Sequence, residues 1–392
     1  MASTSTTQNP SPDYPKQYND SVYIFYDPGE VRKIEIIFFH DVLWKDCEEP
    51  HIQSWMSRGA SKVCWPEVWL KLKYPEARIL SVRYDAEMQK SNKGGYLDLF
   101  QVAENLKQDI LEIYEGNRPL VLVAHGFGGL IIKKLVKEVA DAGALTRPAS
   151  NSEQANNNPY KCKEDCFVEN VKGVFYYAPS FMGSTLADSM KGRPNVGSLV
   201  KFLEVFNEEI SRLNNWFSSW RQRGHCKAIG IGATHPTKWA VESNMVTTIF
   251  RCLEVLLCIR ESSDALTLMV AEGSSRYDVD EYYNSARDHF NICKPLSETD
   301  SSFHMLLELI DEVISTTARQ ISTIVESPSD DFVDKTLSRL PQLDVISLDR
   351  NELMKTTHFR EKYQHLMDGL KEAGFERISR SAGKEFWKKY ET

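Results

Sequence analysis

Short apolar runs alternate with longer amphipathic stretches through most of the chain. A run that is apolar at nearly every position is typical of a strand buried on both faces of a parallel sheet, whereas apolar residues three and four apart indicate one face of a helix. The predicted strands are 33–40, 79–82, 120–124, 171–178, 226–232 and 266–271. The predicted helices are 97–113, 128–136, 200–220, 239–260 and 303–318. This alternation predicts an α/β fold with a mainly parallel central sheet flanked by helices.

The strand 120–124 leads into a glycine-rich turn, and the next helix begins within that turn at Gly128-Gly129. A strand, a sharp turn and a glycine-led helix form the frame of a nucleophile elbow, whose pattern is G-x-S-x-G. Gly126 stands at the serine position of that pattern, so the turn has no side-chain oxygen to attack a substrate. The residue at an elbow sits in a strained backbone conformation, and we expect Gly126 to have a positive φ because glycine adopts it without a Cβ penalty.

Further motifs follow one another in a fixed order along the chain. They are Phe38-Phe39-His40-Asp41, Trp65 with Trp69-Leu70, Ala124-His125 with Gly128-Gly129-Leu130, Gly183-Ser184, and Asp288-His289 with Asn291-Ile-Cys-Lys-Pro295. Together they resemble the serine-active-site-containing (SERAC-like) branch of the α/β-hydrolases, a branch of lipase and esterase type. The resemblance covers about residues 30–320 and implies an α/β-hydrolase fold.

The resemblance also implies a role for single positions of the catalytic site. His289 matches the triad histidine, Gly126 the nucleophile, and Ala233 the glutamate that orients the histidine. The oxyanion-hole positions are Asp41, Val42 and Phe127, and Asp41 replaces a glycine of the family pattern. A methyl group cannot fix an imidazole tautomer, and a carboxylate would repel a developing oxyanion. The implied catalytic site therefore departs from the family at three positions.

The pocket that the resemblance implies contains His40, His125, Phe181, Met182 and Ser184. Phe181 takes the place of a histidine of the family pattern, so we expect this wall of the cleft to be apolar. Ser184 matches a family residue and is interpreted as a helix N-cap. The alternative is that Ser184 or Ser180 lies within reach of His289 and serves as a displaced nucleophile.

Composition divides the chain into three predicted parts. Residues 1–19 are rich in Ser, Thr, Pro and Asn and are expected to be disordered, and 20–322 form the hydrolase-like domain. Within this domain, 148–170 is interpreted as an inserted surface loop and 239–260 as an inserted helix. Residues 323–392 are interpreted as a linker followed by a C-terminal helical extension with an amphipathic stripe.

Charge and cysteine content indicate where the protein is located and which classes of partner it can bind. The formal net charge of −8, without a basic stripe, argues against nucleic acid as the main partner. Eight cysteines without a disulfide framework favour reduced thiols and a cytoplasmic location. Cys162 and Cys166 would need two more ligands nearby to hold zinc, so we expect no metal and no cofactor. No apolar run reaches a membrane-spanning length, so no transmembrane segment is expected, and peripheral membrane association stays open.

Three functional hypotheses follow from these residues. The first is a pseudoenzyme, an inactive α/β-hydrolase homologue that keeps its pocket for a small hydrophobic or acyl ligand, or acts as a protein-interaction module. The second is an active serine-type ester or lipid hydrolase that uses a displaced nucleophile such as Ser184. The third is a scaffold that binds a protein partner through its C-terminal helices. Loss of the nucleophile and of the acid favours the first hypothesis, because triad hydrolysis needs both.

Overall fold

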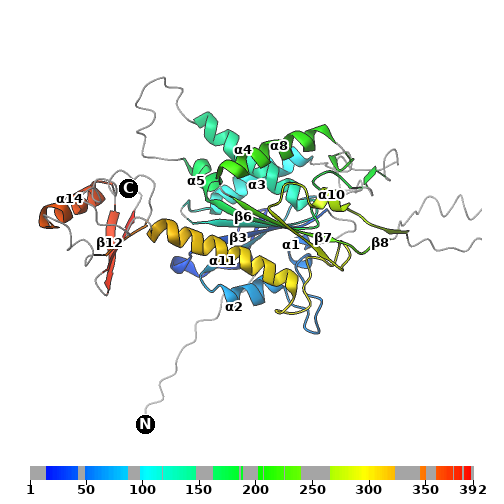
Figure 1. Ribbon diagram of the computed structural model, residues 1–392, viewed down its shortest axis with the longest axis horizontal. Helices are drawn as coiled ribbons and strands as arrows, with labels where there is room; N and C mark the ends of the chain where they lie inside the picture. Colours follow the sequence, from blue (N-terminus) through cyan, green and yellow to red (C-terminus); the bar gives the residue numbers. More distant parts are fainter. Residues whose placement is uncertain are drawn as a thin grey trace, which may run out of the picture.

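The computed structural model describes residues 15–42, 49–86, 98–116, 118–146, 162–184, 187–188, 202–205, 207–224, 226–239, 265–322, 345–349, 359–373, 375–381 and 384–389. An eight-stranded sheet lies at the centre of the molecule, with the strand order β1-β2-β4-β3-β5-β6-β7-β10 (Figure 1). Its strands are β1 (Lys16–Gln17), β2 (Val22–Tyr26), β3 (Ile34–Phe39), β4 (Ala77–Val82), β5 (Leu120–His125), β6 (Val171–Tyr177), β7 (Lys227–Ala233) and β10 (Glu281–Ser285). The pairs β1·β2 and β2·β4 are antiparallel, and every other pair is parallel.

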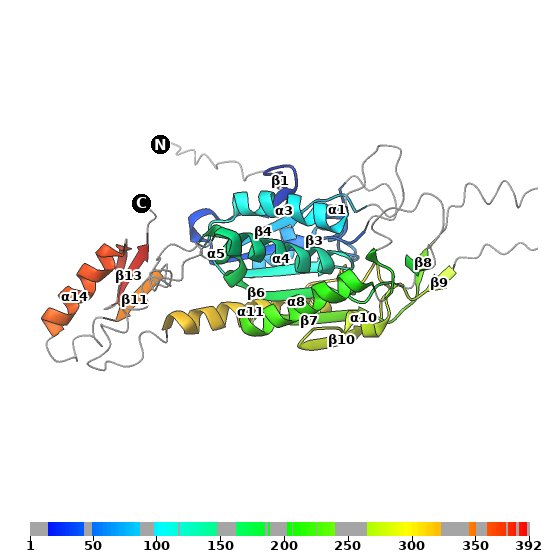
Figure 2. The ribbon, with the colours of Figure 1, turned by 90° about the horizontal axis from the view of Figure 1, so that it is seen from above.

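Helices cover both faces of this sheet (Figures 1 and 2). One face carries α3 (Leu99–Ile113), α4 (Gly128–Thr146), α5 (Lys163–Asn170) and α8 (Glu208–Gly224), and the other carries α2 (Lys71–Lys73) and α11 (Ser301–Ser322). The shorter elements are α1 (Pro50–Gln53), α10 (Glu272–Ser275), η1 (Gly29–Val31) and η2 (Pro66–Leu70). The layered α/β architecture predicted from the sequence is confirmed.

The apolar runs of the sequence belong to strands that are buried on both faces, as their pattern predicted. Alternate residues of β3 contribute to two different cores, Ile37 and Phe39 to the core under α3, α4 and α8, and Ile36 and Phe38 to the core under α11. Both faces of each central strand are thus withdrawn from water, so polar positions in these strands are few. Because β3 and β5 are parallel neighbours, their carboxyl ends lie side by side and bring the two loops that follow them together.

The prediction of a last sheet strand at 266–271 is wrong. In that region only β9 (Ala265–Thr267) is extended, and it pairs with β8 (Thr237–Trp239) in a separate two-stranded antiparallel sheet. Met269 and Val270 are instead buried in a loop against Phe290. The last strand of the central sheet is β10, whose residues are half-buried or exposed. An edge strand of this kind lacks the continuous apolar run by which the inner strands were recognised.

Two segment boundaries differ from the sequence prediction. Residues 163–170 of the predicted surface loop form α5, because Phe167 is buried and packs edge-on against Tyr114. At the N-terminus, β1 pairs with β2, so the ordered part of the domain begins before residue 20. Residues 1–14 and most of the predicted inserted helix 239–260 lie outside the described residues.

The C-terminal extension contains the expected helix and a sheet that the sequence did not predict. Helix α14 (Phe359–Glu372) lies beside β11 (Val345–Asp349), β12 (Phe375–Ser381) and β13 (Lys384–Lys389), which form an antiparallel sheet in the order β11-β13-β12 (Figure 1). Strands β12 and β13 carry many charged residues, and β11 has only five residues. Within the part of the chain that is described, no helix is both long and apolar enough to cross a membrane.

Candidate functional site

The elbow has the geometry that its sequence predicts. Strand β5 ends at His125, helix α4 begins at Gly128, and Gly126 between them has a φ of +51°. This left-handed conformation costs an ordinary L-residue roughly 1–2 kcal/mol, and glycine avoids most of that cost. The Gly126 amide also donates a hydrogen bond of 2.9 Å to the Tyr177 carbonyl, which ties the turn to the end of β6. The predicted positive φ at Gly126 is thereby confirmed.

Asp41 extends its side chain into the elbow. Its Oδ1 accepts a hydrogen bond of 2.7 Å from the backbone N–H of Phe127, the residue directly after the elbow glycine. A Cβ placed on Gly126 would lie only 2.1 Å from the same oxygen, well inside van der Waals contact. The Asp41 carboxylate therefore occupies the volume that a serine side chain at position 126 would need. The departures at Gly126 and Asp41 are therefore linked, because the carboxylate needs the space that glycine leaves.

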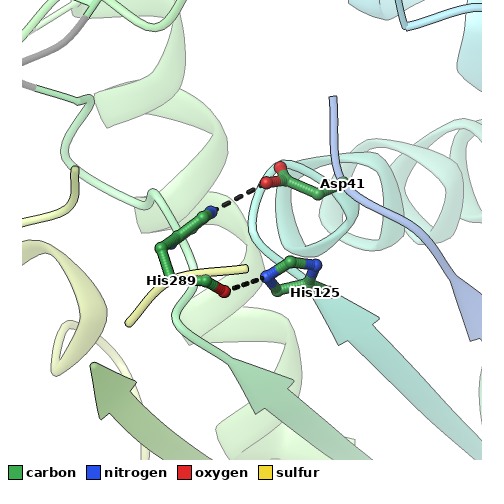
Figure 3. Close-up of side chains that lie close together, drawn as sticks. All are labelled: Asp41, His125 and His289. Carbon is green, nitrogen blue, oxygen red and sulfur yellow. Dashed lines mark hydrogen bonds and ion pairs between the residues drawn. The ribbon is translucent and has the colours of Figure 1, made fainter. Parts of the chain in front are cut away.

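His289 contacts the second oxygen of the Asp41 carboxylate (Figure 3). It follows β10 by four residues, and its Nε2 lies 2.7 Å from Asp41 Oδ2. Its backbone N–H donates to Thr237 Oγ1 at 3.1 Å, which holds the segment next to β8. No hydrogen-bond partner for its Nδ1 is found among the described residues. Asp41 thus bonds the nitrogen that would face a nucleophile, and the opposite nitrogen is left without a partner.

The charge state of Asp41 fixes the direction of this hydrogen bond. Burial alone would raise the pKa of Asp41, but the charge and hydrogen bond of His289, the nearby His125 and the Phe127 N–H outweigh burial and lower it to about 2. An ionised carboxylate can only accept hydrogen bonds, so the proton lies on His289 Nε2. A general base needs an unprotonated Nε2 that faces the nucleophile. His289 is therefore held in the wrong form for base catalysis.

His125 lies next to His289 (Figure 3). Its Nε2–H donates to the His289 carbonyl at 2.8 Å, and the two ring centroids are 4.9 Å apart. Burial lowers the pKa of His125 to about 4, so the ring is neutral near pH 7. The residue supports the backbone of His289 and keeps it in place over the elbow.

His40 and Val42 hold the backbone on both sides of Asp41. The His40 ring stacks on Tyr84 with centroids 4.0 Å apart, and its Nδ1–H donates to the Asp41 carbonyl at 2.7 Å. The Tyr84 hydroxyl donates in turn to the His40 carbonyl. Val42 is buried in the core under α4. Sequence reasoning missed Tyr84 and Thr237 as supports of this loop, because neither pattern nor spacing connects them with Asp41.

The remaining predicted pocket residues have partners of their own. Phe181 is fully buried. Lys133 Nζ lies over the face of its ring, 3.6 Å from the ring centroid. The Met182 N–H donates to Ser274 Oγ at 2.8 Å. The Ser184 hydroxyl donates to the Met269 carbonyl at 2.6 Å. These contacts place Phe181 against α4, and Met182 and Ser184 in the packing between the loop after β6 and the region of α10.

Ala233 ends β7, next to the start of the segment that carries His289. Strands β7 and β10 are parallel, and Ala233 is paired with Ser285, four residues before His289. The resemblance implied the orienting acid at this position. Alanine offers no side-chain acceptor for a histidine, and Ala233 packs against the core under α11.

The chain is similar in sequence to known proteins. No protein-family model matches it. It is 23% identical over 319 residues to Protein SERAC1 of Danio rerio. This match covers 76% of this chain and 42% of that protein. It is 26% identical over 188 residues to Protein SERAC1 of Homo sapiens, which covers 44% of this chain and 26% of that protein. The chain is homologous to SERAC1. It spans less than half the length of these SERAC1 relatives.

Solved structures with a similar arrangement include lipases. Phospholipase PlaB from Legionella pneumophila matches with a TM-score of 0.45 and 11% identity over 91% of this chain and 68% of that chain. The propeptide form of the Bacillus licheniformis lipase BlEst2 matches with a TM-score of 0.43 and 13% identity over 72% of this chain and 51% of that chain. The mostly parallel eight-stranded sheet with flanking helices is the arrangement that the resemblance to the α/β-hydrolases implied.

Proposed function

We propose that this SERAC1 homologue is a pseudoenzyme, an α/β-hydrolase domain that no longer hydrolyses esters and serves as a binding module. One observation carries the proposal, the Asp41 carboxylate in the place of the nucleophile, between the Phe127 N–H and His289 Nε2. In an active serine hydrolase, the same N–H stabilises the oxyanion and the same nitrogen takes the serine proton. Asp41 engages both groups at once.

The case against hydrolysis rests on separate requirements of the chemistry. Position 126 offers no nucleophile, His289 Nε2 is a donor, and Ala233 supplies no acid. A negative carboxylate next to the oxyanion site would also oppose the charge that develops in the transition state. Because a triad works as a unit, the loss of its nucleophile alone removes most of the covalent chemistry.

The alternative, an active hydrolase with Ser184 as nucleophile, receives less support. The Ser184 hydroxyl is buried and donates to the Met269 carbonyl, so its proton is already engaged by an acceptor other than His289. His289 Nε2 is in turn bonded to Asp41. For Ser184 to be activated, both hydrogen bonds would have to break before any substrate could react.

The ligand we propose is a small hydrophobic or acyl molecule. The α/β-hydrolase frame supports this class. The third hypothesis, a protein partner on the amphipathic stripe of α14, is less favoured because Leu366, Met367 and Leu370 of that helix are already buried. A cytoplasmic location, with peripheral membrane contact as the alternative, is also part of the proposal, on the grounds of the thiol content.

The proposal can be tested with a fluorophosphonate probe and short-chain acyl esters on the purified chain. Intact-mass measurement should show no added label, and ester turnover should equal that of a His289→Ala control. Stoichiometric labelling mapped to Ser180 or Ser184 would overturn the pseudoenzyme and establish the displaced nucleophile.

A further inference from the structure

The changes that remove the catalytic serine also bring three metal-ligating side chains together. Asp41, His125 and His289 each place one donor atom within 4.8 Å of the other two (Figure 3). All three residues are more than nine-tenths buried, with exposed fractions of 7%, 4% and 3%. We propose that this cluster binds one divalent first-row transition-metal ion of the Zn²⁺ or Co²⁺ kind. The proposal concerns ion binding alone and does not depend on whether the domain hydrolyses esters.

The donor set determines the class of ion. Two imidazole nitrogens and one carboxylate oxygen suit zinc, cobalt, nickel or ferrous iron, whereas magnesium and calcium prefer oxygen ligands throughout. Three protein ligands also leave a coordination position open for water or for a ligand group, as in metal sites that bind exogenous molecules. The cluster thus fits a transition-metal site with one open position.

The cluster exists because of the substitutions at the elbow. An ordinary side chain at position 126 would overlap Asp41, so glycine there gives the carboxylate its room. The three ligands then come from the loops after β3 and β10 and from the end of β5, which converge at the carboxyl edge of the sheet. The sequence did not predict the cluster, because its members are 84 and 164 residues apart along the chain (125 − 41 and 289 − 125).

The three donor atoms, which lie within 4.8 Å of one another, would have to move to hold an ion, and His125 would bind it through Nδ1 or through Nε2 after its hydrogen bond to the His289 carbonyl breaks. Asp41 Oδ2 and His289 Nε2 are 2.7 Å apart, and two ligands of a tetrahedral zinc ion stand about 3.4 Å apart. The ion would replace the proton on His289 Nε2. His289 Nδ1 has no hydrogen-bond partner among the described residues, so it has room to carry a proton while Nε2 binds the ion.

The test uses the full-length chain without an affinity tag, stripped with a chelator and then titrated with Co²⁺ and with Zn²⁺. We expect one equivalent of Co²⁺ to bind with the visible d–d absorption of a low-coordinate site, and Zn²⁺ to displace it. Asp41→Asn and His125→Gln should each weaken binding by more than about 100-fold, beyond the usual effect of losing an outer-shell partner. The matched control His235→Gln changes an exposed histidine outside the cluster and should leave the affinity unchanged.

A second measurement needs no variant and therefore does not depend on how the substitutions fold. X-ray absorption of the Zn²⁺-loaded chain should show nitrogen and oxygen ligands with two imidazoles and no sulfur. Thermal unfolding of each metal-free variant identifies any loss of affinity that comes from unfolding. The proposal is overturned by the absence of stoichiometric binding, by a sulfur ligand, or by an affinity that folded Asp41→Asn and His125→Gln variants share with the unsubstituted chain.

Discussion

At the scale of single residues, Gly126 and Asp41 form a pair in which each makes the other acceptable. Glycine frees the space above the elbow, and the carboxylate fills it and bonds the Phe127 N–H that would otherwise be buried without this partner. A buried donor that loses its acceptor costs roughly 1–3 kcal/mol. The pair therefore stabilises the elbow in the absence of the catalytic serine.

The pairing predicts strong coupling in a double-mutant cycle. Gly126→Ala should destabilise the chain through both its positive φ and its overlap with Asp41, whereas in an Asp41→Gly background only the φ cost remains. We expect a coupling free energy of at least about 1 kcal/mol from denaturant unfolding of the four variants. Additive effects of the two substitutions would mean that the two side chains do not compete for the same space.

Asp41 also predicts a pH dependence of stability. Its pKa is lowered from 3.8 to about 2 in the folded chain, so the ionised form contributes on the order of 2 kcal/mol above pH 4. This contribution is lost as the pH falls from about 4 through about 2, because the folded pKa is the depressed one. The free energy of unfolding relative to Asp41→Asn should therefore decline in that window. A difference that stays constant with pH would contradict the low pKa.

The sequence named candidate residues for the site but not how they meet. Gly126, Ala233 and His289 were assigned through the resemblance, from the motifs in which they stand. The resemblance also identified Asp41 as a departure, but the direction of its side chain depends on the space above Gly126, which no local pattern reveals. The unpaired Nδ1 of His289 was equally out of reach, since it depends on contacts between distant loops.

At the scale of elements, the close approach of β3 and α4 sets the position of the site. A Cβ on Gly128, the first residue of α4, would lie 2.5 Å from the Phe39 carbonyl and 2.7 Å from the His40 carbonyl. The helix can therefore begin directly beside the loop that carries Asp41 only because glycine stands at this position. This packing brings the Phe127 N–H within reach of the carboxylate.

Gly128→Ala should accordingly destabilise the chain by roughly 1–3 kcal/mol, the usual cost of overpacking a rigid contact. Gly224→Ala is the matched control, since a Cβ at the end of α8 would meet no atom within 4 Å. Chemical denaturation of both variants gives the comparison. Equal stabilities would show that α4 and β3 are not held at the observed separation.

The inner elements could be predicted from the sequence, and the outer ones could not. Strands β3, β4, β5, β6 and β7 are buried on both faces and therefore appear as apolar runs. The edge strand β10 and the strands of the C-terminal sheet carry polar and charged residues, so periodicity does not separate them from loops. Their pairing depends on neighbours that lie far away in the sequence.

At the scale of the whole molecule, the hydrolase domain and the C-terminal extension have separate buried residues. Among the residues whose burial is described, those of the two core clusters of the domain end at Ile314, and Leu366, Met367 and Leu370 of α14 are buried apart from these clusters. This division indicates that the core of the domain does not need the extension to exclude water.

A chain of residues 1–325 should therefore stay soluble and unfold cooperatively. Its melting temperature should lie within a few degrees of that of the full chain, as measured by calorimetry. The near-ultraviolet circular dichroism of the buried Trp55 and Trp65 provides a control for native packing. An insoluble or noncooperative product would mean that α14 and its sheet complete the core of the domain.

The central claim is that the Asp41 carboxylate takes the place of the nucleophile in an otherwise preserved hydrolase frame. Hydrolysis of an activated ester by three rebuilt variants tests it most directly. Gly126→Ser alone should stay at background, because the new side chain and Asp41 compete for one space. Gly126→Ser with Asp41→Gly should remain weak, since loss of the orienting acid costs about 10⁴-fold in a serine protease. Adding Ala233→Glu should raise turnover measurably, and His289→Ala should abolish the gain. Robust turnover by Gly126→Ser alone would contradict the claim.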